Sequence, residues 1–228
     1  MYSLVPASLI VFCLSASGIM AEQAAANDFA HGGGAHGGPR LAVMALNLFD
    51  IGKARKDPQT VLTAARLMAL VGMQDGGPLT KETIGDAPAE ETAGAAAQPL
   101  TAAEMLAAAR GFALQDDLLL TLIDAAEAET AGKPVGGTIA RLSHLSGGQT
   151  DRWEVPYFGN APAELAIIGD GDANLDVTVE DASDQRICVD LSPSDRMFCD
   201  FVPAENGYVH VTVKNTGTAQ NSYYLLTN

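Results

Sequence analysis

The chain has 228 residues, which is enough to bury one sizeable hydrophobic core or two small ones. Its 28 acidic residues outnumber its 13 basic residues and give a formal net charge of −15. So acidic a surface argues against nucleic acid and anionic membranes as partners, and it favours solubility outside the cytoplasm.

The first 21 residues have the pattern of an export signal. Residues 4–20 are almost wholly apolar or small, too short and too rich in Ser and Gly for a membrane span. Ala21 is a small residue suited to cleavage before Glu22, although no Lys or Arg precedes the apolar run. We expect a cleaved signal peptide, a periplasmic or secreted bacterial protein, and no integral membrane span in the mature chain. An uncleaved anchor is the alternative.

Residues 22–40 contain AHGGGAHGGP, a glycine-rich stretch that cannot pack a core and predicts a flexible leader. His31 and His36 could bind a metal together. Two histidines on a flexible chain lack the further ligands of a closed metal site, so we prefer the interpretation as a linker.

Residues 41–135 carry helical patterns with one interruption. Residues 41–53 are apolar on most faces, and Asp57 followed by Pro58 predicts the start of a second helix that pairs with the first as a hairpin. Residues 74–99 are poor in large apolar residues and rich in Gly, Pro, Ala and acidic residues. We expect them to form a mobile acidic insert.

Two further helices are expected after the insert. Thr101 and Glu104 have the spacing of a capping box ahead of an apolar face. A last helix begins at Asp116 or Asp117 and stops at Gly132. Such short helices could form a small bundle or two hairpins that rest on a sheet. A groove between the hairpins could bind a partner, but a purely packing role is the preferred interpretation.

Residues 136–228 have β patterns throughout. Their central stretch, AELAIIGDGDANLDVTVED at 163–181, is an apolar strand, an acidic glycine turn and a second, alternating strand. Eight short strands at roughly ten-residue spacing predict an antiparallel β-sandwich of the jelly-roll type. The expected fold is therefore α+β, with helical hairpins before the sandwich. The expected strands are 138–145, 150–158, 163–168, 174–181, 185–191, 196–202, 207–215 and 222–227.

Cys188 and Cys199 are the cysteines that remain after signal cleavage, and an even count in an oxidising compartment favours a disulfide over a metal site. If residues 192–195 formed a hairpin turn, the antiparallel register would place the two cysteines directly opposite each other. The same register would set Val189 against Phe198, with both side chains in the core.

The acidic glycine turn carries oxygen ligands at alternate positions. Asp170, Asp172, Asn174 and Asp176 have the spacing by which an EF-hand loop supplies its first calcium ligands. Leu175 stands where that loop needs glycine, and Asp176 is expected to leave the turn with the following strand. Two alternatives stay open: no cofactor, with these side chains hydrogen-bonded to their own backbone, or a weakly bound calcium that stabilises the sandwich.

From about residue 138 to 228 the chain resembles the bacterial pre-peptidase C-terminal (PPC) domain and its periplasmic relatives. The segments that carry the resemblance are DGDANLDVTVED, ENGYVHVTVKNTG and QNSYYLLTN. The resemblance implies a calcium-tolerant β-sandwich that is often appended to secreted hydrolases, where it aids secretion, stability or attachment to substrate. In this chain a helical region, rather than a protease domain, precedes the module.

The sequence contains no HExxH, GxSxG or P-loop motif, and no GxGxxG after a strand. His144 and His210 have no Ser or Cys nucleophile nearby in sequence and are expected to be structural. The sequence therefore predicts a non-catalytic exported protein that binds or stabilises an envelope or extracellular protein or polymer. One alternative is a carbohydrate-binding module, although Trp153, the single tryptophan, is expected in the core. Another is a small secreted hydrolase whose active site is not visible in sequence.

Overall fold

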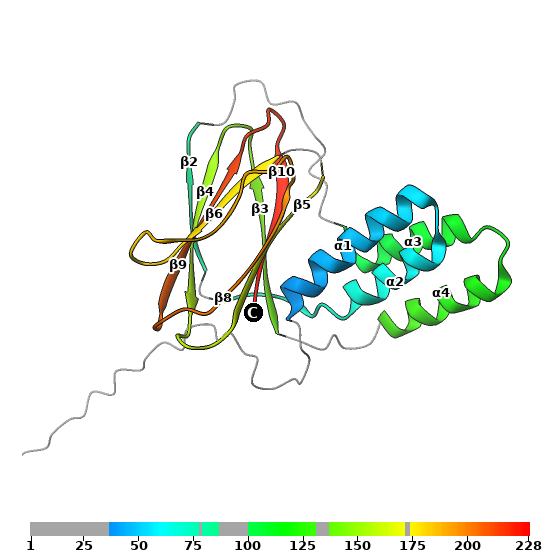
Figure 1. Ribbon diagram of the computed structural model, residues 1–228. Helices are drawn as coiled ribbons and strands as arrows, with labels where there is room; N and C mark the ends of the chain where they lie inside the picture. Colours follow the sequence, from blue (N-terminus) through cyan, green and yellow to red (C-terminus); the bar gives the residue numbers. More distant parts are fainter. Residues whose placement is uncertain (1–36, 78, 87–99, 131–136, 172–173) are drawn as a thin grey trace, which may run out of the picture.

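The computed structural model describes residues 37–77, 79–86, 100–130, 137–171 and 174–228. The expected signal peptide and most of the expected leader lie outside these ranges. Within them a helical bundle packs on one face of a β-sandwich, so that helices and two sheets form three layers (Figure 1). The helices are α1 (Gly38–Arg55), α2 (Pro58–Ala69), α3 (Ala102–Ala113) and α4 (Asp117–Thr130).

Local sequence signals determine where the helices start. The Asp57 side chain accepts a hydrogen bond of 3.0 Å from the backbone N–H of Gln59, which caps α2 as expected. Thr101 and Glu104 form the predicted reciprocal capping box of α3. α1 begins at Gly38, three residues before the helical region was expected to start at residue 41, because Pro39 suits the first turn of a helix.

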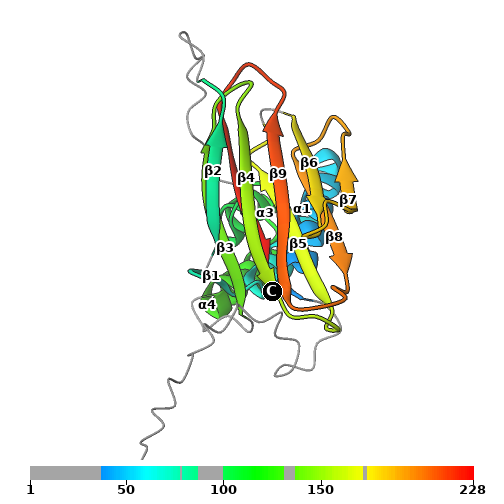
Figure 2. The same ribbon diagram turned by 90° about the vertical axis from the view of Figure 1, so that its left-hand side faces the viewer.

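The ten strands of the described residues form two five-stranded sheets. Sheet A has the order β1-β3-β10-β5-β8, and sheet B has the order β2-β4-β9-β6-β7 (Figure 2). Every neighbouring pair is antiparallel except β1 with β3. The strands are β1 (Met73–Asp75), β2 (Thr80–Ile84), β3 (Thr138–Leu145), β4 (Thr150–Tyr157), β5 (Ala163–Gly169), β6 (Leu175–Glu180), β7 (Arg186–Asp190), β8 (Arg196–Phe201), β9 (Gly207–Asn215) and β10 (Asn221–Thr227). The order of β3 to β10 is that of a jelly roll, which confirms the expected α+β fold.

The first part of the expected mobile insert is ordered β structure, so that prediction is wrong for residues 74–75 and 80–84. β1 extends sheet A in parallel to β3, and β2 extends sheet B antiparallel to β4. All five residues of β2 are exposed. An exposed edge strand needs no large apolar residues, so its composition is like that of a loop.

Burial along the strands follows the three layers. β5 is buried at every position, because sheet B covers one of its faces and the helices cover the other. β6 alternates between buried and half-buried residues, because the outer face of sheet B meets solvent. α1 lies directly on β5, β8 and β10, and the other helices pack behind it. The expected hairpins therefore form a bundle that also rests on a sheet.

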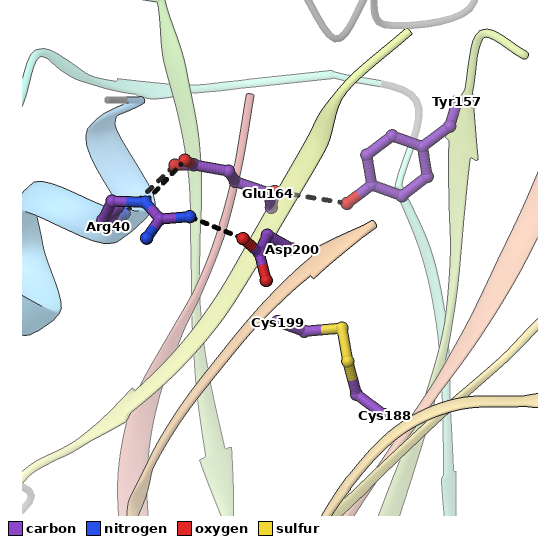
Figure 3. Close-up of a disulfide and its surroundings, with 6 residues drawn as sticks. All are labelled: Arg40, Tyr157, Glu164, Cys188, Cys199 and Asp200. Atoms are coloured by element: carbon purple, nitrogen blue, oxygen red, sulfur yellow. Dashed lines mark hydrogen bonds and ion pairs between the residues drawn. A yellow bond between two sulfur atoms is a disulfide. The ribbon is translucent and has the colours of Figure 1, made fainter. Parts of the chain in front are cut away.

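The Cys188–Cys199 disulfide is present, but it does not lie within a hairpin (Figure 3). β7 pairs with β6 at the edge of sheet B, and β8 pairs with β5 at the edge of sheet A, so the bond joins the two sheets. The predicted register is wrong because the jelly-roll connection sends β7 and β8 to different sheets. Val189 is consequently exposed rather than in the core, and Phe198 packs towards the helices.

Candidate functional site

The acidic glycine turn lies against the loop that precedes β8. Asp195 in that loop accepts a hydrogen bond from the backbone N–H of Gly171, and its own carbonyl accepts one of 2.8 Å from Gly169. A Cβ atom on Gly169 would lie 2.4 Å from Asp195 Oδ2, and Gly171 has a φ of +95°, so the turn requires both glycines. Asp170 Oδ2 accepts a hydrogen bond of 2.9 Å from the backbone N–H of Ser222.

The structure brings two of the predicted calcium ligands, Asn174 and Asp176, into contact, whereas Asp170 binds the backbone of Ser222. Asn174 donates its side-chain N–H to Thr216 Oγ1 at 2.9 Å, and its Oδ1 is buried without a hydrogen-bond partner among the described residues. Asp176 lies on β6 across from Lys214, and its Oδ1 accepts a hydrogen bond of 3.4 Å from Asn174 Nδ2. Asp172 lies outside the described residues. No three His, Cys, Asp or Glu side chains in the described ranges are grouped so that they could hold a metal.

Asp195 contributes to this site, although the sequence analysis predicted only that it lies in a turn. Its side chain is 9% exposed. Burial raises the pKa of its carboxyl group, and the charge of Asp170 raises it further, while the Gly171 N–H and Arg196 act in the opposite direction. The two carboxylates are close enough for their charges to repel each other. The local sequence carries no signal for this, because the turn and the loop meet only in the fold.

A polar pocket of about 620 Å³ opens between α1 and the acidic turn, and we call it the turn pocket. Its lining includes Asn47, Asp50, Gly171, Asn174, Asp195 and Arg196. Arg196 forms an ion pair with Asp50, which ties β8 to α1 and already neutralises part of the negative charge. The turn pocket therefore has oxygen donors for a cation together with a competing guanidinium group.

A second polar cluster surrounds Asp151, which is 0% exposed between the sheets, while the β2 members of the cluster are exposed at the edge of sheet B. Its carboxylate accepts hydrogen bonds from four side chains on three other strands, and we call the cluster the Asp151 network. Its donors are Lys81 Nζ at 3.2 Å, Thr83 Oγ1 at 2.5 Å, Ser143 Oγ at 2.7 Å and the Tyr223 hydroxyl at 2.7 Å.

The Asp151 network combines a serine, a lysine and a tyrosine, but its geometry is that of a structural ion pair. Ser143 donates a hydrogen bond to the Asp151 carboxylate and accepts one from Lys81 Nζ at 2.8 Å, so the lysine acts as a donor rather than as a base. Burial and the charge of Asp151 raise the pKa of Tyr223 well above its usual value. Trp153 Nε1 donates to the Tyr223 hydroxyl at 2.7 Å, so the tryptophan lies in the core as predicted.

The two histidines have different surroundings. His144 Nδ1 lies 2.8 Å from Ser222 Oγ, a pairing that the sequence spacing did not reveal. Ser222 is fully buried, so a substrate has no access to its hydroxyl. His210 lies on the outer face of sheet B between Glu154 and Glu180 of the neighbouring strands. Neither histidine is beside an accessible nucleophile in these contacts.

A more apolar pocket of about 510 Å³ lies at one end of the sandwich, and we call it the end pocket. It is formed by the β6–β7 turn, the start of β7 and the β8–β9 connection. Its apolar lining is Ile187, Phe201, Val202, Pro203, Tyr208 and Val209. Val202 is 62% exposed and Tyr208 is 52% exposed, so apolar side chains are accessible at its mouth.

The fold and these sites define a jelly-roll β-sandwich module with a helical bundle on one face and no visible catalytic centre among the described residues. No protein-family model and no curated protein matches the chain. The crystal structure of the pre-peptidase C-terminal domain of collagenase from Bacillus anthracis is similar at 13% sequence identity, with a TM-score of 0.34. The match covers 39% of this chain and 87% of that domain.

Proposed function

We propose that the protein is a non-catalytic exported protein whose sandwich binds another component of the cell envelope or extracellular space through the end pocket. The accessible apolar mouth of that pocket, with Val202 and Tyr208 exposed, is the observation that carries the proposal. A concave site with exposed aliphatic and aromatic side chains is typical of surfaces that bind a partner. By contrast, Asp151 and Ser222 are themselves fully buried.

Two features are compatible with an exported protein. The chain forms a disulfide, which persists in oxidising compartments. None of the helices in the described ranges is long and apolar enough to cross a bilayer.

Cross-linked pull-down of the mature protein from its own envelope tests the proposal. The pocket variant is Val202→Ser with Tyr208→Ala, and the matched control is Leu191→Ser. Leu191 is 66% exposed but lies outside the pocket. The wild type and the control should recover the same component, while the pocket variant should recover at least about tenfold less, a loss of about 1.4 kcal/mol or more. Equal recovery by the pocket variant would contradict the proposal.

The nature of the recovered component separates the alternatives. Tyr208 is the one aromatic among the exposed large apolar side chains of the described residues, and a sugar-binding platform generally needs more than one exposed ring. We therefore expect a protein partner. An enriched polysaccharide would support the carbohydrate-binding alternative. Release of a cleaved product from that polymer would support the hydrolase.

We further propose that the acidic turn binds calcium weakly and that the ion stabilises the sandwich. The buried Asn174 Oδ1, without a described partner, fits a cation ligand, and Asp170 with Asp195 supplies negative charge. Calcium would neutralise this charge, and the expected Kd is ~10⁻⁴ to 10⁻³ M, as in extracellular modules. At ten times its Kd, calcium would stabilise the fold by about 1.4 kcal/mol.

Thermal unfolding at increasing calcium concentration measures this effect. The melting temperature of the wild type should rise with millimolar calcium, and Asn174→Ala and Asp172→Ala should each reduce the rise. Glu82→Ala, which removes an exposed carboxylate on the edge strand β2, is the control and should keep it. A wild-type melting curve that is indifferent to millimolar calcium would leave the turn with a structural role alone.

A further inference from the structure

The end of the helical bundle remote from the sandwich exposes large apolar side chains. Both helical turns, α1–α2 and α3–α4, lie at this distal end (Figure 1). Leu114 is 78% exposed and Leu118 is 73% exposed beside the α3–α4 turn, and Ile51 is 49% exposed near the α1–α2 turn. Large apolar side chains exposed at one end of a folded protein indicate a contact surface.

The conformation of Leu114 also needs an explanation. It has a φ of +51°, in a region that a leucine rarely adopts, and its side chain points away from the core. Ala113 before it is buried, and Gly111, three positions earlier, is exposed. The large apolar Leu114, rather than either of these small residues, has the strained conformation. Local strain of this kind is often found at functional positions.

The two turns carry opposite charges. The α1–α2 turn has Lys53, Arg55 and Lys56, all exposed and none in an ion pair with a described residue. The α3–α4 turn has Asp116 and Asp117, both exposed. The charges suit the dipoles of their own helices, but that role leaves the exposed leucines unexplained.

We propose that the distal end of the bundle is a self-association surface on which a second copy of the chain docks. In a two-fold arrangement the basic α1–α2 turn of each copy faces the acidic α3–α4 turn of the other. The apolar side chains of Ile51, Leu114 and Leu118 are buried between them. Such an interface is self-complementary in charge, as a closed symmetric dimer requires. The proposal is independent of the end pocket, which lies on the sandwich.

Sedimentation velocity over a concentration series tests the proposal, at ~0.15 M salt to screen the net negative charge. The wild type should show a monomer–dimer equilibrium. Lys56→Glu and Asp117→Lys should each weaken the dimer at least about tenfold, because each places like charges in contact. An equimolar mixture of the two variants should recover association, since both charge contacts of the mixed dimer are attractive again.

Lys214→Glu is the matched control, because it reverses an exposed charge on the outer face of sheet B. It should dimerise like the wild type, and Leu118→Asn should weaken the dimer while Leu191→Asn should not. Circular dichroism melting confirms that each variant is folded. A wild type that stays monomeric, charge variants that associate unchanged, or a mixture that fails to recover association would each overturn the proposal.

Discussion

At one side of the sandwich the edge strands β7 and β8 are joined by the Cys188–Cys199 disulfide, whereas at the opposite side β2 and β3 are joined by the Asp151 network. Both links connect sheet A to sheet B. The first is a single covalent bond between two residues. The second depends on hydrogen bonds and ion pairs among side chains from β2, β3, β4 and β10.

This difference determines how each side responds to change. A disulfide acts largely by restricting the unfolded chain, so it tolerates changes in the side chains around it. A buried carboxylate is stabilised only while its donors are present, and loss of one partner leaves others unpaired in a medium of low polarity. The Asp151 side of the sandwich should therefore be the more sensitive to single substitutions.

The largest effect is expected for Asp151→Ala. The change leaves the Lys81 ammonium and the hydroxyls of Ser143, Thr83 and Tyr223 without their acceptor, and it should lower the free energy of unfolding by about 3–5 kcal/mol. Urea denaturation measures the loss. Glu82→Ala, an exposed carboxylate on β2, is the control and should stay within about 0.5 kcal/mol. A loss below about 1 kcal/mol for Asp151→Ala would show that the Asp151 side is not the more sensitive of the two.

Removal of the disulfide comes next. The bond closes a loop with a sequence separation of 11 residues, so reduction or Cys188→Ser with Cys199→Ser should cost about 3 kcal/mol in the entropy model. Denaturation with and without reductant measures the cost in the wild type. The double variant should be indifferent to reductant. Two reactive thiols in the unreduced mature protein would show that the bond does not form.

Tyr223→Phe should have an intermediate effect. It removes one donor to Asp151 and the acceptor of the Trp153 N–H without leaving a large cavity, and it should cost about 1–3 kcal/mol. Tyr224→Phe is the control, because the next tyrosine points to the opposite face of sheet A. Equal stabilities for the two variants would show that the Asp151 network contributes little.

Asp195→Asn should show the smallest effect, as a change in pH dependence. The pKa of Asp195 is raised in the folded state, so between its ordinary value of 3.8 and the raised one the folded protein binds more protons than the unfolded chain. This contribution is present at low pH and is lost as pH rises through the folded pKa. The wild type should therefore lose stability relative to Asp195→Asn over that range, measured by denaturation at successive pH values. If the stabilities of the wild type and Asp195→Asn changed with pH in parallel, the raised pKa of Asp195 would be refuted.

Most of the fold could be predicted from local patterns. The turns and alternation place β3 and β9 at their observed bounds, and capping residues place α2 and α3. The disulfide pair followed from the cysteine count. β2 was missed, because an edge strand has the composition of a loop.

The sites could not be predicted, because each combines residues that only the fold brings together. Asp151 and Tyr223 are separated by 72 residues, and no local pattern links them. Asp195 reaches Gly171 across 24 residues, from a loop whose sequence indicates only a turn. The pairing of β7 and β8 was wrong for a similar reason, since the choice between sheets depends on the whole jelly roll.

The central claim is that the disulfide and the Asp151 network stabilise the two sides of the sandwich independently. Amide hydrogen exchange of the native protein, with the disulfide intact and reduced, tests this most directly. With the disulfide reduced, amides of β7 and β8 should lose protection while those of β2 and β4 keep theirs, because the Asp151 network holds that side alone. In Asp151→Ala with the disulfide intact, the amides of β2 and β4 should lose protection while those of β7 and β8 keep theirs. Loss of protection on both sides together after reduction alone would contradict the account.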